Sequence, residues 1–543
     1  MKNVRVLDCT LRDGGRIIDC AFPNQETKDI SNRLSDAKID IIEVGFIRDH
    51  KQVNYQGNST FFTDVNQIRP FVKKEKDNII YAAFIDYGMC DIDALKPYDG
   101  TSIDAIRFGF TKKNYDEEYD EVVRWARVIK EKGYKLFVQG VNSLNYSDLE
   151  LLQVVQMVNE IHPYSFGIVD TYGAMYMDDV DRLYGLIDHN MLPDICINFH
   201  SHNNYQLSFA FAQEVIKLSA NSTRHIIIDG TLLGIGKVAG NLNTELLVEF
   251  LNRKMKYSYD LDKIFDTIDE YIHKYTLEHK WGYSIPALMA GIYKSHPNNV
   301  IYLTEKFRLD SKDIGKLLSM IDPAKRQRYD YDNIQRLYID YNHTKIDDSD
   351  AIEQLKGVLS NRNILLLLPG HSILEYKKEI EKYIHDNKPF IISVNFVAPY
   401  GDNSNRMTFY GSTKRYRNSE KRKGEKNIVV SNVENYSSSD IIVNYESLIE
   451  RNNDDFDNTM IMLLNLLKRL DIRKYAIAGF DGYHHGDNNY FDDSKFQGNR
   501  FQTKYDTITE NMRKMLSDYA MTLDRKEDVV FLTPSAYSDI FVN

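Results

Sequence analysis

The sequence contains few cysteines, the residues that cross-link many secreted proteins through disulfide bonds. It has only four cysteines among 543 residues, and these are scattered rather than spaced for a metal site or a disulfide framework: Cys9, Cys20, Cys90 and Cys196. The first residues contain no apolar stretch typical of a secretory signal, and no later run reaches the roughly 18 apolar residues of a membrane span. We therefore expect packed thiols in a cytoplasmic protein that does not insert into membranes.

The chain also lacks an excess of basic residues. Its formal net charge is -11 at pH 7, so broad affinity for nucleic acids is not expected. Apolar residues make up 43% of the sequence, which is ordinary for a globular protein. Because domains typically contain roughly 100–200 residues, the length allows two or three of them.

Short apolar runs alternate with amphipathic segments at the start of the chain. Such runs are typical of parallel strands that are buried on both faces. Between them, apolar residues recur at helical spacing, as in 116–132, and Ser147 and Glu150 form a capping box. Eight strand–helix units predict a (β/α)8 barrel over residues 1–256, with a doubly wound open sheet as the alternative. The predicted strands are 4–8, 41–46, 79–85, 105–109, 135–139, 165–170, 196–200 and 225–229.

The pattern changes twice after the barrel. Residues 257–350 contain helical segments and no good strand, so we interpret them as a helical extension followed by a linker. Strands and helices alternate again over residues 351–543, which predicts a separate three-layer α/β domain of ordinary size. In this domain Gly370, His371 and Ser372 follow a strand, and they either bind a phosphate at a helix N-terminus or form an ordinary turn.

The strongest candidates for a functional site lie at the ends of the first and seventh predicted strands. His200 and His202 lie two positions apart on an extended strand, so their side chains point the same way. Arg12 and Asp13 follow the first strand, and strand ends meet at one rim of such a barrel. Two imidazoles and the Asp13 carboxylate suit a divalent cation with open positions. A lone His-x-His pair is more often structural, but its place on the same rim as Asp13 favours the metal.

Other polar residues fall on the same predicted rim. The candidates for substrate binding at or near these strand ends are Glu43, Arg107, Asp170 and Thr171. Arg12 stabilises negative charge that develops on a substrate, or forms a structural ion pair with Glu43 or Asp170, and the two roles are compatible. Asn241 ends the glycine-rich loop 234–241 and is an equal candidate for a metal ligand and for a loop hydrogen bond.

Three separated motifs resemble the DRE-TIM metallolyase superfamily. They are Leu-Asp-Cys-Thr-Leu-Arg-Asp-Gly at residues 7–14, His-Ser-His-Asn at residues 200–203, and residues 236–245. The superfamily includes hydroxymethylglutaryl-CoA lyase, the isopropylmalate and homocitrate synthases, and the 4-hydroxy-2-oxovalerate aldolases. Residues 229–236 and 291–295 look most like the aldolase branch.

The resemblance implies roles for individual residues. The implied metal ligands are Asp13, His200, His202 and, as in the lyase branch, Asn241. Arg12 would be the catalytic arginine that stabilises an enolate, and Tyr293 falls at an active-site tyrosine of the aldolases. Mn²⁺ or Mg²⁺ is the favoured cation, with Co²⁺ and Zn²⁺ as alternatives.

Arg16 departs from the aldolase pattern. The aldolases place a histidine base three residues after the metal-binding aspartate, and this chain has Arg16 there. A guanidinium cannot act as a base at neutral pH, but it can bind a substrate carboxylate or phosphate through two nitrogens. Metal-bound hydroxide and Tyr293 are then the candidate bases.

The C-terminal domain has a resemblance of its own. Residues 364–372 and 478–483 resemble Rossmann-like domains from bacterial surface-polysaccharide clusters, some of them related to sialyltransferase-type folds. This resemblance implies that the barrel works on a sugar or a sugar derivative.

Together these observations predict a metal-dependent aldolase, a carbon–carbon lyase that forms or cleaves a 4-hydroxy-2-oxo acid through a pyruvate enolate. Its small-molecule partners would be a 2-oxo acid and a sugar-derived aldehyde, and a homo-oligomer is expected. A Claisen-type acyltransferase that uses acyl-CoA is the first alternative. In the second alternative the C-terminal domain is a nucleotide-sugar transferase or binding module, and the barrel is a scaffold.

Overall fold

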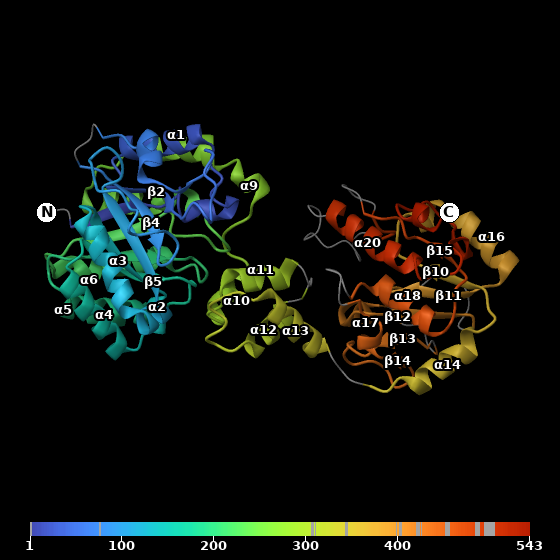
Figure 1. Cartoon of the computed structure of the whole chain (residues 1–543). Helices are drawn as coiled ribbons and strands as arrows, with labels where there is room; N and C mark the ends of the chain where they lie inside the picture. Colours follow the sequence, from blue (N-terminus) through green and yellow to red (C-terminus); the bar gives the residue numbers. More distant parts are fainter. Residues whose placement is uncertain are drawn as a thin grey trace. The chain divides into compact units, whose positions relative to one another are not determined.

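The chain forms two compact units, residues 1–331 and 332–543 (Figure 1). A computed structural model describes residues 3–74, 78–305, 309, 311–342, 346–397, 399–400, 404–419, 424, 426–450, 457–483, 489–492 and 505–542. The finer division into residues 1–256, 257–350 and 351–543 stays a prediction.

The first unit is built around a closed parallel barrel. Eight strands pair in the order β1-β9-β8-β7-β6-β5-β4-β2, and β2 pairs with β1 to close the ring. A two-residue strand, β3 (Phe61–Phe62), adds to the end of β2. The predicted (β/α)8 barrel is confirmed. Its strands are β1 (Val4–Asp8), β2 (Ile41–Ile47), β4 (Ile80–Asp86), β5 (Ala105–Thr111), β6 (Lys135–Val141), β7 (Ser165–Asp170), β8 (Cys196–Ser201) and β9 (Ile226–Gly230).

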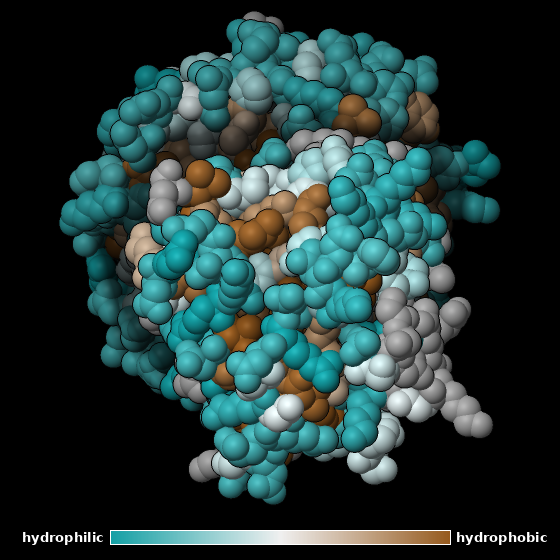
Figure 2. Space-filling view, turned by 90° about the vertical axis from the view of Figure 1, so that its right-hand side faces the viewer, coloured by the Kyte–Doolittle hydropathy of each residue, from teal (hydrophilic) through white to brown (hydrophobic). Residues whose placement is uncertain are grey.

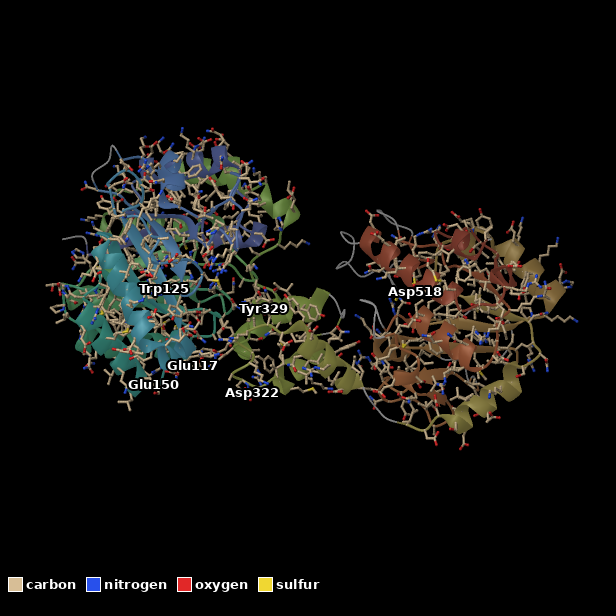
Figure 3. The ribbon with its side chains drawn as sticks, viewed as in Figure 1. Glu117, Trp125, Glu150, Asp322, Tyr329 and Asp518 are labelled. Carbon is tan, nitrogen blue, oxygen red and sulfur yellow. The ribbon has the colours of Figure 1, made fainter. Side chains whose placement is uncertain are left out.

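Helices cover the outside of the barrel. They are α1 (Asn24–Asp36), α2 (Lys112–Glu117), α3 (Tyr119–Glu131), α4 (Asp148–Ile161), α5 (Met177–Asn190), α6 (Ser208–Leu218) and α7 (Thr244–Met255). Trp125 of α3, labelled in Figure 3, stacks on Phe108 of β5 with ring centroids 5.9 Å apart. The capping box of Ser147 and Glu150 forms as expected at the start of α4. The helix expected over 116–132 is split at Glu118, which leaves the helical conformation.

Two connections of the barrel differ from the regular strand–helix unit. A 3-10 helix, Val65–Phe71, stands between β3 and β4. Residues 87–104, between β4 and β5, are all described and form turns without a helix. Gly88, Pro97 and Gly100 interrupt this stretch, and Gly88 and Gly100 adopt positive φ angles. The apolar strand runs are therefore sufficient for barrel closure even where a covering helix is missing.

A helical extension continues the first unit beyond α7. It contains α8 (Leu261–Thr267), the π-helix Ile268–Ile272, α9 (Tyr275–Glu278), α10 (Ile285–Ile292), α11 (Pro297–Glu305) and α12 (Ser311–Met320). The extension binds the rim of the barrel, because Nδ2 of Asn204, after β8, donates to the carbonyl of Ala287 on α10 at 2.8 Å. Gly291 of α10 lies against the backbone of Gly173, after β7. Within the described part of the chain, every helix is too short or too polar to cross a membrane.

The second unit contains a seven-stranded parallel sheet in the order β14-β13-β12-β11-β10-β15-β16. This order is that of a doubly wound, Rossmann-like domain, as expected. Its strands are β10 (Ile364–Leu367), β11 (Phe390–Val394), β12 (Arg406–Tyr410), β13 (Ile428–Val430), β14 (Ile441–Val443), β15 (Tyr475–Ala478) and β16 (Val529–Phe531). Its helices are α13 (Tyr331–Asn342), α14 (Ser349–Leu359), α15 (Ser372–Glu375), α16 (Lys377–Asn387), α17 (Thr413–Asn418), α18 (Thr459–Arg469) and α20 (Tyr505–Ala520).

Apolar side chains fill both faces of this second sheet. On one face Leu366 and Ile392 belong to a core that includes residues of α14, α18 and α20. On the other face Leu365 and Ile391 pack with residues of α15 and α16. The face of the molecule drawn in Figure 2 is mainly hydrophilic, with hydrophobic areas between the hydrophilic side chains. Scattered apolar side chains of this kind are normal on a globular surface.

Candidate metal centre at the barrel rim

The chain turns back on itself directly after β1. The N–H groups of Arg12, Asp13 and Gly14 point to the carbonyl of Cys9 at 3.1, 2.9 and 3.2 Å. A Cβ at Gly14 would lie only 2.6 Å from Cγ2 of Ile235, so glycine is needed where this turn packs against the loop after β9. The turn places Arg12 and Asp13 over the rim.

Asp13, His200 and His202 converge there. Oδ2 of Asp13 lies 3.8 Å from Nε2 of His200 and 3.7 Å from Nε2 of His202. This oxygen is buried and has no hydrogen-bond partner in the described part of the chain. Metal bonds of about 2.0–2.2 Å to nitrogen and oxygen ligands hold neighbouring ligand atoms at such separations. The three side chains therefore fit one divalent cation.

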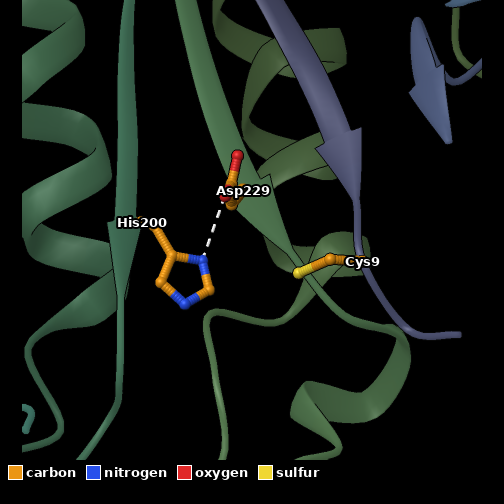
Figure 4. Close-up of side chains that lie close together, drawn as sticks. All are labelled: Cys9, His200 and Asp229. Atoms are coloured by element: carbon orange, nitrogen blue, oxygen red, sulfur yellow. Dashed lines mark hydrogen bonds and ion pairs between the residues drawn. The ribbon is translucent and has the colours of Figure 1, made fainter. Parts of the chain in front are cut away.

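Asp229 of β9 fixes the orientation of His200 (Figure 4). Oδ2 of Asp229 lies 3.0 Å from Nδ1 of His200. Because an ionised carboxylate can only accept, Nδ1 carries the hydrogen and Nε2 keeps its lone pair for a cation. Burial alone would raise the pKa of Asp229, but Arg107 and His200 hold that pKa below its usual value. Asp229 thus remains an anion that supports the ligand His200.

Cys9 completes the cluster in Figure 4 as a packed thiol. Its Sγ donates to the carbonyl of Gly230 at 3.4 Å. Burial raises the pKa of this thiol well above its usual value. In the structure Cys9 therefore packs beside His200 and Asp229 with its hydrogen donated to the backbone.

Asn241 lies beside His202, with which it forms an isolated antiparallel bridge. Its Nδ2 donates to the carbonyl of Ile235 at 3.1 Å, so the expected loop hydrogen bond is present. Its Oδ1 is buried and has no partner among the residues that the structure describes. The two roles open to Asn241 therefore use different atoms, and the free oxygen can serve as a further ligand.

Electrostatics keep the ligand set in its metal-binding form. Burial alone would raise the pKa of Asp13, but Arg12, His202 and His200 hold it well below its usual range. Burial is also the main cause that lowers the pKa of His202 to about 4. At neutral pH the site thus offers an ionised carboxylate and a neutral imidazole from His202.

Arg12 is fixed by two carboxylates. Its Nε donates to Oε2 of Glu43 and its Nη1 to Oδ1 of Asp13, both at 2.7 Å. The guanidinium also lies 4.7 Å from the ring centre of Phe84. Of the two expected ion-pair partners, Glu43 is the one that Arg12 binds. The arrangement holds a permanent positive charge beside the metal ligand Asp13.

Arg107 lies deeper in the barrel and is fully buried. Its Nη1 donates to Oε2 of Glu43 at 2.9 Å, and its Nη2 donates to Asp229 and, at 3.0 Å, to Asn198. Glu43 and Arg107 therefore link Arg12 to Asp229 beneath the triad. In these positions they support the site, and a direct contact of either with substrate stays a prediction.

Asp170 and Thr171 stabilise the loops around the rim. The Asp170 carboxylate accepts the N–H groups of Ala174 at 2.8 Å and Met175 at 3.3 Å, and burial raises its pKa to about 7. Oγ1 of Thr171 accepts the N–H of Asn142 at 2.8 Å. Their predicted part in substrate binding stays a prediction.

Arg16 lies beside the triad, and the Tyr293 hydroxyl lies against α12. Nε of Arg16 lies 3.2 Å from Oδ1 of Asp13, and its side chain is 38% exposed. Tyr293 follows α10, and a Cβ at Gly315 of α12 would lie 2.9 Å from its hydroxyl. The guanidinium of Arg326 lies 5.8 Å from the centre of the Tyr293 ring. The expected role of Tyr293 as an active-site tyrosine stays a prediction.

No sequence motif indicates the role of Asp229. A signal was present, because this carboxylate ends the apolar run 226–228 at the rim of the barrel. The pairing of Asp229 with His200 depends on neighbouring strands β8 and β9, which only the tertiary structure brings into register.

Comparisons with known proteins agree with this geometry. Residues 3–270 match the HMGL-like family model. The 4-hydroxy-2-oxovalerate aldolase of Pelotomaculum thermopropionicum is 26% identical over 321 residues, which cover 57% of this chain and 89% of that protein. The oxaloacetate decarboxylase of Mycobacterium tuberculosis is 26% identical over 262 residues, which cover 48% of this chain and 74% of that protein.

A solved structure of HMG-CoA lyase from Brucella melitensis aligns with 16% identity and a TM-score of 0.41, over 49% of this chain and 96% of that chain. The residues that match the family model include all strands of the closed barrel and all the candidate metal ligands, from Asp13 to Asn241. The resemblance read from the three motifs is confirmed, and residues 3–270 of this chain are an HMGL-like domain of the DRE-TIM type.

Proposed function

We propose that the barrel is a divalent-metal-dependent aldolase that cleaves or forms a 4-hydroxy-2-oxo acid, with pyruvate as the 2-oxo product or substrate. The observation that carries this proposal is the position of Oδ2 of Asp13, which has no hydrogen-bond partner in the described chain and faces Nε2 of both His200 and His202 beside the Arg12 guanidinium. The similarity to 4-hydroxy-2-oxovalerate aldolases supports the reaction class.

Asp13, His200, His202 and Oδ1 of Asn241 would hold the cation. When bound, the cation supplies Lewis-acid chemistry that polarises the oxygens of a 2-oxo acid. A carboxylate, an amide oxygen and two imidazoles mix hard and intermediate ligands, so we favour Mn²⁺ or Mg²⁺, with Co²⁺ and Zn²⁺ as alternatives.

The chain's own residues supply charge and orientation. The Arg12 guanidinium, held by Glu43 and Asp13, stabilises the oxyanion that develops on the keto oxygen when the C3 proton or the C3–C4 bond is lost. Asp229 keeps the His200 hydrogen on Nδ1, away from the cation. Arg107 holds the Glu43 and Asp229 carboxylates in place, and its charge helps to keep the pKa of Asp229 below its usual value.

We further propose that the aldehyde is derived from a sugar of surface-polysaccharide metabolism. The support is the resemblance of residues 364–372 and 478–483 to domains from such clusters. A cytoplasmic location is proposed because all four cysteines are free thiols.

Proton exchange at the pyruvate methyl group tests the reaction class. The purified protein with Mn²⁺ in D₂O should exchange these protons at a rate that NMR can follow, and EDTA should abolish the exchange. Arg12→Lys keeps a charge but loses the planar fork, so it should slow the exchange by about 10²-fold. Exchange that survives complete chelation would refute the proposal.

A further inference from the structure

Three chain segments pack against one another at the mouth of the site. The turn after β1 meets the loop after β9, where Gly14 contacts Ile235. That loop in turn binds the helical extension, because the N–H of Gly282 donates to the carbonyl of Val238 at 3.1 Å. Nε1 of Trp281 also donates to the carbonyl of Leu233 at 3.0 Å.

The first segment contributes Arg16, whose charge is only partly neutralised. Its carboxylate partner, Asp13, also binds Arg12 through the same oxygen, while the other oxygen of Asp13 faces the two histidines. The Arg16 guanidinium lies 4.7 Å from the ring centre of Phe46. Arg48, 4.8 Å from the same ring, differs because it has a separate partner in Asp86 at 2.6 Å.

The second segment contributes Lys237, in the loop between β9 and Asn241. The N–H of Gly240 donates to the carbonyl of Lys237 at 3.0 Å, and the carbonyl of Gly240 accepts the N–H of Asn203 at 3.0 Å, so this loop is fixed on the rim. The Lys237 side chain is half-buried and pairs with no carboxylate in the described part of the chain. It therefore adds an uncompensated positive charge at the mouth.

The third segment contributes His296, between α10 and α11. Its Nδ1 accepts the N–H of Asn298 at 3.1 Å, and its ring packs against Tyr329, labelled in Figure 3, with centroids 5.0 Å apart. Burial, together with the charges of Lys237 and Arg16, lowers the pKa of His296 to about 4. At neutral pH the imidazole is therefore neutral, and since Nδ1 accepts, Nε2 carries the hydrogen.

We propose that the aldehyde which reacts at this site carries an anionic group, a phosphate or a carboxylate, bound by Arg16 and Lys237 beside His296. The proposal rests on the proposed aldolase function and names its acceptor class. A guanidinium, an ammonium and a neutral imidazole N–H offer three kinds of donor, and the Asp13 oxygen that pairs with Arg16 is shared with Arg12. Such a set suits an anion with several oxygens better than it suits an uncharged hydroxyl.

Matched aldehydes test this preference in the full-length protein with Mn²⁺. Condensation with pyruvate is measured for glycolaldehyde phosphate against glycolaldehyde, and for succinic semialdehyde against butanal. We expect kcat/KM to be at least tenfold higher for the anionic member of one pair, and the pair that shows the larger preference distinguishes phosphate from carboxylate. Arg16→Gln and Lys237→Gln should each reduce this preference about tenfold, mainly through KM. Lys254→Gln, at an exposed lysine of α7, is the matched control.

Calorimetry with inorganic phosphate and with succinate provides a readout that does not depend on turnover. Binding of one of these anions to the wild-type protein should weaken about tenfold in Lys237→Gln and stay unchanged in Lys254→Gln. If pyruvate protons exchange but neither aldehyde pair shows a preference, the anion site is wrong and the aldolase stands. If exchange fails, the aldolase is wrong, and calorimetry alone decides the anion site. Absence of binding for both anions would then refute it.

Discussion

The turn after β1 in the barrel and the turn after β10 in the second unit have similar features, but their carboxylates differ in hydrogen bonding. Both turns follow a buried parallel strand and contain glycine, and each has a carboxylate beside it or within it, Asp481 in the second unit and Asp13 in the barrel. In the barrel, Oδ2 of Asp13 is buried without a hydrogen-bond partner in the described chain. In the second unit, the Asp481 carboxylate accepts the backbone N–H of Ser372 at 2.8 Å and also its hydroxyl.

This difference decides between a ligand site and an ordinary turn. Asp481 occupies the N–H that a phosphate would need, and the N–H of Gly370 already donates to the carbonyl of Gly479 at 2.9 Å. A Cβ at Gly370 would lie 2.6 Å from the Asp481 carboxylate, so the turn is closely packed on it. Of the two readings of Gly370, His371 and Ser372, the structure favours the ordinary turn. A buried carboxylate oxygen that the fold leaves unpartnered indicates a ligand, whereas one bound to backbone N–H groups stabilises the fold.

The largest expected effect is that of Asp13→Asn. An amide keeps the size of the side chain but loses the charge, so Mn²⁺ affinity and pyruvate proton exchange should both fall by about 10²–10³-fold. Calorimetry with Mn²⁺ and NMR of exchange check this, with Asp120→Asn on exposed α3 as the control. Unchanged Mn²⁺ affinity would show that the triad only stabilises the fold, as the turn after β10 does.

Asp229→Asn should have an intermediate effect. Asp229 does not face the cation but holds the hydrogen of His200 on Nδ1, and removing such a partner typically weakens metal binding about 10–100-fold. The same Mn²⁺ titration measures it. A loss as large as that of Asp13→Asn would mean that Asp229 is itself a ligand.

Asp8 in the barrel, like Asp481, accepts hydrogen bonds from a backbone N–H and from a hydroxyl group. Substituting Asp8 should alter the pH dependence of the free energy of unfolding. Its carboxylate accepts the N–H of Thr10 at 2.9 Å and the hydroxyl of Thr244 at 2.6 Å, and burial raises its pKa from 3.8 to about 6. A raised pKa means that the folded state holds this proton more tightly than the unfolded state. The stability that it contributes is therefore present below pH 4 and is lost as the pH rises through 6.

Relative to Asp8→Asn, the wild type should lose up to about 3 kcal/mol between pH 4 and pH 7. Urea unfolding followed by tryptophan fluorescence measures this in the first unit, because both tryptophans, Trp125 and Trp281, belong to it. A difference between the two proteins that does not change with pH would show that Asp8 titrates normally.

The smallest effect is expected for Asp481→Asn. It should destabilise the second unit by about 1–2 kcal/mol through the weaker hydrogen bond to Ser372. Circular dichroism should show this shift in urea, while tryptophan fluorescence and Mn²⁺ affinity stay at wild-type values. A loss of Mn²⁺ affinity would contradict the separation between a closed turn and an open metal site.

Much of the fold could be predicted because the strands are short apolar runs. All eight barrel strands lie within two residues of their predicted ends, whereas β12 of the second sheet has no clear signal in the sequence. That strand, with Arg406 and Thr408 among its buried residues, lacks a continuous apolar run and is identified by its pairing with β11 and β13. Local pattern cannot reveal a strand whose polar side chains find partners far along the chain.

The chemistry at the rim follows from local features of the sequence. Arg12 and Asp13 after one strand and the His-x-His pair at the end of another are local features, fixed by strand alternation and by the meeting of strand ends in a barrel. Which atoms have a partner depends on the tertiary structure. Among the described residues, Oδ2 of Asp13 has no hydrogen-bond partner, Nδ1 of His200 pairs with Asp229, and the Tyr293 hydroxyl lies against α12. These outcomes depend on contacts between residues distant in the sequence, and pairing and burial of this kind arise only when the barrel closes and the helical extension packs on its rim.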